Sequence, residues 1–115
     1  MSKNYAVSDM LVTVKSREVQ RAIAAAGRGE TDVARKHFLA AAHLERVLAD
    51  DYMSVNAATL SERAMLSAAS CFWRAGATQS AVEVFTELKH ERPSRVREIE
   101  DVEAELAREF PPAAA

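Results

Sequence analysis

Four residues of the types that catalyse reactions or bind metals are spread along the chain: His37, His43, Cys71 and His90. The first two histidines are six residues apart, which turns them to different faces of a helix. No His-x-x-x-His spacing, second cysteine or glycine-rich phosphate loop accompanies them. The single cysteine lies in an apolar segment, which favours a buried, inert thiol over a nucleophile. We therefore expect no enzymatic activity, no metal site and no cofactor.

The composition predicts one helical domain. The 115 residues are 49% apolar and have a formal net charge of −2, with only three glycines and three prolines. A single cysteine suits a reducing compartment, and a near-neutral charge gives no reason to expect nucleic acid. No apolar run reaches the roughly 18 residues of a membrane-spanning helix. We expect a cytoplasmic, all-α domain over residues 1–110, no membrane partner, and a disordered tail at 111–115.

The first two helices are predicted from their caps and breakers. The first ends near Ala26, where glycines follow, and either Ser8 or Ser16 is a plausible start. The second begins at Thr31 and continues to about Ala49. The acidic side chain next to Thr31 is favourable at a helix N-terminus.

The second half of the chain begins with a segment that lacks hydrophobic periodicity, 50–58, which predicts a loop. Thr59 and Glu62 have the T-x-x-E spacing of a capping box at the start of the next helix. Ser94 is a suitable cap for the last helix, whose apolar residues form one narrow stripe. The predicted helices are 59 to just before Gly76, 78–91 and 95–109.

A pattern of small residue, glycine, alanine and phenylalanine occurs twice, the second time 47 residues further along. In a helical hairpin, the glycine permits a tight turn, the alanine lets the helices cross closely, and the phenylalanine fills the space below. The matched positions are Ala22, Gly29, Ala34 and Phe38, then Ala69, Gly76, Ala81 and Phe85. We predict two antiparallel hairpins, at about 16–49 and 59–91, and a C-terminal amphipathic capping helix.

This pattern resembles the tetratricopeptide repeat family, whose helix-turn-helix unit has small, glycine, alanine and aromatic residues at these spacings. The likeness covers about 16–49 and 63–93, and Pro93 falls near the family's closing proline. The two units are 47 residues apart, whereas repeats of the family follow one another at about 34. An ordinary four- or five-helix bundle with glycine turns is the alternative fold.

The resemblance implies a function in binding. The first helix of each unit would line a groove that holds a partner peptide or helix, as in an adaptor or chaperone. Carried over residue by residue, the groove positions are Ser16, Val19, Ile23, Ala26 and Gly27, then Arg63, Leu66, Ser70, Trp73 and Arg74. Arginine and tryptophan are frequent interface anchors. The sequence leaves open whether Trp73 lies in this groove or in the core.

A second hypothesis is self-association. Several apolar residues have no place in the two hairpins: Tyr5, Val7, Met10, Leu11, Val12 and Val14, with Tyr52, Met53 and Val55 in the predicted loop. A two-repeat array has an open first end, and a symmetric homodimer would bury it.

A third, less favoured hypothesis is DNA binding. The segment "AGATQSAV" at 75–82 resembles the turn and recognition helix of helix-turn-helix proteins, in which Gln79 and Ser80 would contact bases. Phe72 stands where that motif has a small residue, and Glu83 would face phosphates.

Overall fold

A computed structural model describes residues 3–112, with side chains from Asp9 onward, and all regular structure in this range is helical. The all-α prediction is therefore confirmed. No helix within the described range is both long enough and apolar enough to cross a membrane. The elements are α1 (Lys3–Gly27), α2 (Thr31–Ser54), α3 (Ala58–Arg74), α4 (Thr78–Glu91), the 3-10 turn η1 (Pro93–Arg95) and α5 (Val96–Glu109).

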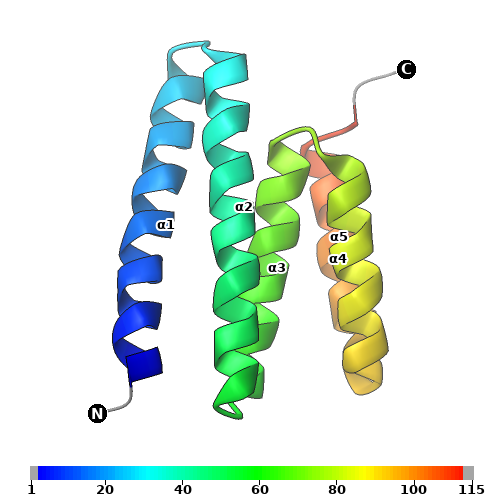
Figure 1. Cartoon of the computed structure of the whole chain (residues 1–115). Coiled ribbons are helices and arrows are strands. Elements are labelled where there is room, and N and C mark those ends of the chain that lie inside the picture. Colours follow the sequence, from blue (N-terminus) through cyan, green and yellow to red (C-terminus); the bar gives the residue numbers. More distant parts are fainter. Residues whose placement is uncertain (1–2, 113–115) are drawn as a thin grey trace.

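The first four helices run alternately up and down, and each packs against the next one along the chain (Figure 1). The last helix, α5, packs against both α3 and α4. Within the described residues, α1 and α3 both pack on α2, yet no α-carbon of α1 lies within 8 Å of one in α3. The result is a thin array whose α-carbons extend over 44 × 31 × 16 Å.

All three turns between the first four helices have the same backbone design. Gly29, Asn56 and Gly76 have positive φ angles of 76°, 60° and 81°. In each turn the amide of the following residue donates to the carbonyl five residues earlier, which is the Schellman pattern of helix ends. These bonds are Glu30 to Ala25 at 2.9 Å, Ala57 to Tyr52 at 2.8 Å and Ala77 to Phe72 at 2.9 Å. Gly29 and Gly76 thus lie just past helix ends, as predicted, while the turn at Asn56 was missed.

The predicted loop at 50–58 is wrong for most of its length. The second helix continues to Ser54, and α3 begins at Ala58, so only three residues connect them. Tyr52, half-buried, packs against the hydrophobic core and gives the last turn of α2 a tertiary anchor. Packing against a core decides helix length more strongly than local periodicity does.

The predicted side-chain caps are also wrong. The N-cap residue of α3 is Ala57, and no side chain caps that helix. Glu62, the second member of the predicted capping box, is buried and pairs with Arg95, 3.1 Å away. Ser94 lies inside η1 and caps nothing. The helices begin instead on backbone hydrogen bonds, such as that from the Ser61 amide to the Ala57 carbonyl at 3.0 Å.

The first helix is longer than either predicted start allows, because α1 already begins at Lys3. Both Ser8 and Ser16 lie inside it. Its inward side chains recur at three- and four-residue steps over more than four turns, which supports one continuous amphipathic helix. From Asp9 onward they include Leu11, Lys15, Glu18, Ala22 and Ala25, of which only the two alanines are fully buried.

The alanines and phenylalanines of the duplicated pattern are all buried, in both hairpins. They are Ala22, Ala34 and Phe38 in the first unit and Ala69, Ala81 and Phe85 in the second. The shift of 47 residues therefore relates equivalent inward positions. Of the predicted tail, Pro111 and Pro112 lie outside the helices, and 113–115 lie outside the described residues.

Ala81→Leu tests the close contact in the second hairpin. Ala81 has no exposed surface, so the added methylenes have no space and should cost about 1–3 kcal/mol of unfolding free energy. Leucine at exposed Glu83, on the same helix, should change it by no more than about 0.5 kcal/mol. Urea unfolding of both variants measures this, and equal midpoints would mean that the contact at Ala81 is misplaced.

Candidate functional site

The predicted groove residue Trp73 belongs to the core in this structure. It is 8% exposed, and its indole N–H donates to the carbonyl of Phe110 at 2.6 Å. The end of α5 therefore covers it, and a partner would have to displace that end to reach it. Leu66, half-buried, also packs against the core.

A hollow of about 230 Å³ lies between α1 and α3, with α2 as its floor. It exists because, over the described residues, these two helices share a neighbour while their α-carbons stay more than 8 Å apart. We call it the α1–α3 groove. It is lined by Val12 and Lys15 from α1, Glu45, Leu48 and Tyr52 from α2, and Leu60, Arg63, Ala64 and Ser67 from α3.

Two of the predicted groove residues lie on the α1 side of this arrangement. Val19 is half-buried against the core, and Ile23 is exposed. Val12, Val19 and Ile23 recur at seven- and four-residue steps, which puts them on one side of α1. The α1 wall of the groove thus continues as an apolar stripe toward the end of that helix.

The floor of the groove holds a buried carboxylate. Glu45 is only 4% exposed, and its Oε1 lies 3.7 Å from the Lys15 Nζ. Burial raises the pKa of Glu45, while the positive charge of Lys15 and a hydrogen bond with Ser67 oppose the rise. The three side chains come from three helices, so this polar cluster ties α1 and α3 to α2.

Exposed apolar side chains occur on several segments at one end of the array. They belong to the N-terminal half of α1, to the end of α2, to the α2–α3 turn and to the start of α3, which Figure 1 places at the same end. They are Met10, Val12, Val14, Met53, Val55 and Leu60. Of the other predicted self-association residues, Leu11 is half-buried against the core, and the side chains of Tyr5 and Val7 lie outside the described residues.

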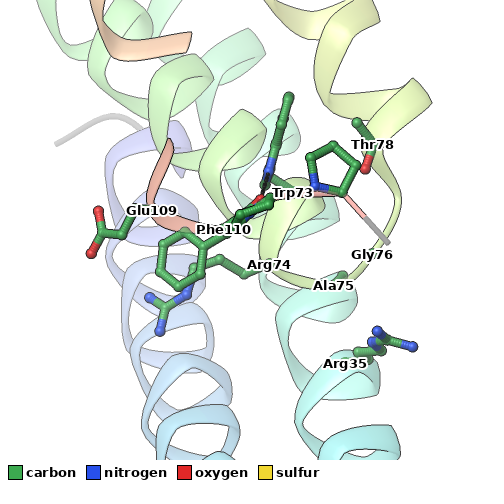
Figure 2. Close-up of a pocket in the computed structure, with 10 residues that line it drawn as sticks. Arg35, Trp73, Arg74, Ala75, Gly76, Thr78, Glu109 and Phe110 are labelled. Atoms are coloured by element: carbon green, nitrogen blue, oxygen red, sulfur yellow. Dashed lines mark hydrogen bonds between the residues drawn. The ribbon is translucent and has the colours of Figure 1, made fainter. Parts of the chain in front are cut away.

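A larger hollow of about 480 Å³ lies at the opposite end of α3, between the α3–α4 turn, α2 and the end of α5 (Figure 2). We call it the Arg74 cavity. The guanidinium carbon of Arg74 lies 4.3 Å from the ring centre of Phe38 and 5.0 Å from that of Phe110. Such cation–π contacts hold a guanidinium in place. Arg35 also lines this cavity.

Three of the predicted groove residues line a hollow, and these three are divided between two hollows. Arg63 lines the α1–α3 groove, whereas Trp73 and Arg74 line the Arg74 cavity. Ser70 lies between them on α3, half-buried. By their spacing, Arg63, Ser70 and Arg74 share one side of α3, so the two hollows are the ends of one helix face.

His37, His43 and Cys71 have structural surroundings, whereas His90 is exposed. His37 Nδ1 lies 2.6 Å from Glu18 Oε2, which links α2 to α1, and His43 packs edge-on against the Phe72 ring. Burial raises the pKa of the Cys71 thiol to about 11, so it stays protonated at neutral pH. The described residues include no group of three or more side chains that could hold a metal ion.

The segment proposed for DNA recognition lies at the start of α4. Gln79 is exposed, whereas half-buried Ser80 lines a hollow that also includes Glu83 and Arg46. The acidic Glu87 on the same helix pairs with Arg46 at 3.0 Å.

Sequence reasoning missed Lys15, Glu45 and Ser67 as site residues. One signal was present: Glu45 stands four residues from both Ala41 and Ala49, in the middle of an apolar helix face. A lone acid at that position needs a partner when the face is buried. The partners come from other helices, and only the fold shows which ones they are.

Comparison with known proteins finds no match for this chain among family models, curated protein sequences or solved structures. The tetratricopeptide resemblance accordingly stays a prediction.

Glu45→Gln tests the buried carboxylate through pH. The pKa of Glu45 in the folded protein is raised above its ordinary value of 4.5, so the folded protein binds this proton more tightly than the unfolded chain does. The unfolding free energy of the wild type should therefore fall as the pH rises from 4.5 through the raised pKa. The glutamine variant lacks this loss. Its unfolding free energy relative to wild type should therefore increase between pH 4 and pH 7, as urea unfolding across this range would show.

The matched control is Glu105→Gln, at an exposed position of α5. Its difference from wild type should stay flat over the same pH range. If the two variants behave alike, Glu45 is not the titrating group.

Proposed function

We propose that this protein is a non-catalytic interaction module that holds a segment of a partner protein in the α1–α3 groove. One observation supports this above all: over the described residues, α1 and α3 both pack on α2, and no α-carbon of one lies within 8 Å of an α-carbon of the other. The hollow between them has side chains of α2 as its floor, of which Glu45 and Leu48 are buried and Tyr52 is half-buried.

The lining of the groove is suited to a protein segment. Val12 and Leu60 present exposed apolar surface on opposite walls, and Tyr52 lies between them. Burying such surface drives association, while the cations Lys15 and Arg63 orient a partner of complementary charge. The resemblance to the tetratricopeptide family adds support, because that family uses grooves of this kind.

Leu60→Glu tests this function. Leu60 is 44% exposed in the groove wall, so the fold should tolerate the substitution while the groove acquires a charge that repels apolar surface. We expect recovery of bound partners from the source cells to fall about tenfold, equivalent to about 1.4 kcal/mol. Quantitative mass spectrometry of the captured proteins gives the measurement.

Val47→Glu is the control, because Val47 is 48% exposed and lines a different hollow. It should retain the wild-type set of partners. Circular dichroism verifies that both variants are folded. If Leu60→Glu captures the same proteins as wild type in the same amounts, the groove is not the binding site.

Self-association is a second candidate, favoured by the exposed apolar residues around the N-terminal half of α1. Met10 is 69% exposed and Val14 is also exposed, and a symmetric dimer would bury both. Sedimentation should then find a dimer that Met10→Asp with Val14→Asp converts to monomer. Ile23→Asp, at a position further along α1 whose exposure lies between those of Met10 and Val14, should leave it dimeric. A monomeric wild-type protein at micromolar concentration contradicts this candidate.

A further inference from the structure

Arg74 is unusual among the basic residues of this protein. The other lysines and arginines that the structure describes as half-buried each pair with a glutamate: Lys15, Arg46, Lys89, Arg92 and Arg95. Arg74 is also half-buried, but over the described residues it forms no ion pair and donates no hydrogen bond. A partly desolvated cation normally has an anionic partner.

The surroundings of Arg74 indicate the chemistry of that missing partner. Aromatic stacking engages the flat face of a guanidinium and leaves the N–H groups at its edge free to donate. Figure 2 shows the Arg74 side chain extending toward the Phe110 ring at the cavity. Over the part of the chain that the structure describes, Arg35 lines the same cavity without an ion pair, and the one acid in its lining, Glu109, pairs with neither arginine. A carboxylate, which accepts two parallel N–H bonds from arginine, matches this site.

The position of Arg74 relates it to the α1–α3 groove. Arg63, Ser67, Ser70 and Arg74 follow one another at four-, three- and four-residue steps, so they share one side of α3. Arg63 lines the groove and, within the described part of the chain, is also without an ion pair. Eleven residues of α-helix span about 16 Å. This side of α3 therefore has a cation at each end, about that distance apart.

A helix fits this face better than an extended peptide does. An extended segment needs hydrogen-bonding partners for its own backbone. Here the walls are helices whose backbone groups bond internally, and no asparagine or glutamine lines either hollow. A helix satisfies its own backbone groups and offers an apolar stripe to such a groove.

We propose that the partner segment is an amphipathic helix with two acidic residues eleven positions apart, one bound by Arg74 and the other by Arg63. This inference rests on the proposed function, because it names the kind of partner that the groove accepts. The acids lie on the same side of the partner helix as its apolar residues, at either end of them.

Two synthetic peptides test the inference. Both are fluorescent, alanine-rich helices of identical composition with one leucine stripe, and their two glutamates are eleven residues apart in one and four apart in the other. Fluorescence anisotropy with the full chain should show about tenfold tighter binding of the eleven-residue spacing. Arg74→Gln and Arg63→Gln should each remove this preference. Arg97→Gln, at an exposed arginine of α5, is the control that should retain it.

The inference would be overturned if the two peptides bound with equal affinity or if neither peptide bound. It would also be overturned if the Arg74→Gln variant kept the preference for the eleven-residue spacing. Should Arg74→Gln fail to fold by circular dichroism, Arg74→Lys replaces it. Lysine keeps the charge but lacks the two-pronged donor, so an undiminished preference in that variant also overturns the inference. The comparison of Leu60→Glu with wild type in partner capture tests the proposed function separately.

Discussion

The close approach of helices through alanine is the constraint on which this structure depends. Among the described residues, ten of the 21 buried apolar side chains of the core are alanines. Small side chains bring helix backbones close together and fill little space between them. The array is therefore thin, and over the described residues α2 packs on two neighbours whose α-carbons stay more than 8 Å apart, with the buried side chains of Glu45 and Leu48 beneath the hollow between them. The groove follows from this packing.

The three matching turns make this packing regular. Because each has one residue with positive φ followed directly by the first capping residue of the next helix, successive helices reverse direction in nearly the same way. Glycine adopts this conformation at no steric cost, and asparagine is the next most tolerant residue. The apparent duplication at Gly29 and Gly76 is thus the more visible part of a three-turn series that includes Asn56.

The features that could be predicted from sequence are those set by local chemistry. The bounds of α4 follow from the turn at Gly76 and from the proline two residues after Glu91, and the glycine turns follow from backbone freedom. The end of α2 and the role of Glu62 could not be predicted. A core contact of Tyr52 sets the former, and the latter depends on Arg95, which is 33 residues away.

The residues of the candidate site also divide into those that local sequence could predict and those that it could not. Arg63 and Arg74 could be proposed from their positions within one repeat unit. Lys15 and Glu45 could not, because the contact that gives them a role joins two helices. A polar residue acquires its partner only when the chain has folded.

The first helix is attached differently from the others. Of its described side chains, only Ala22 and Ala25 are fully buried, while Leu11 and Val19 are half-buried against the core, and Lys15 and Glu18 make polar contacts with Glu45 and His37 of α2. Two alanines and two half-buried apolar side chains contribute less hydrophobic free energy than the buried residues of α3 do. In native-state hydrogen exchange, the amides of α1 should therefore open at a lower free energy than those of α3, which is covered on both sides. One wall of the groove is thus held less firmly than the other, so the width of the groove can adapt to the segment that enters it.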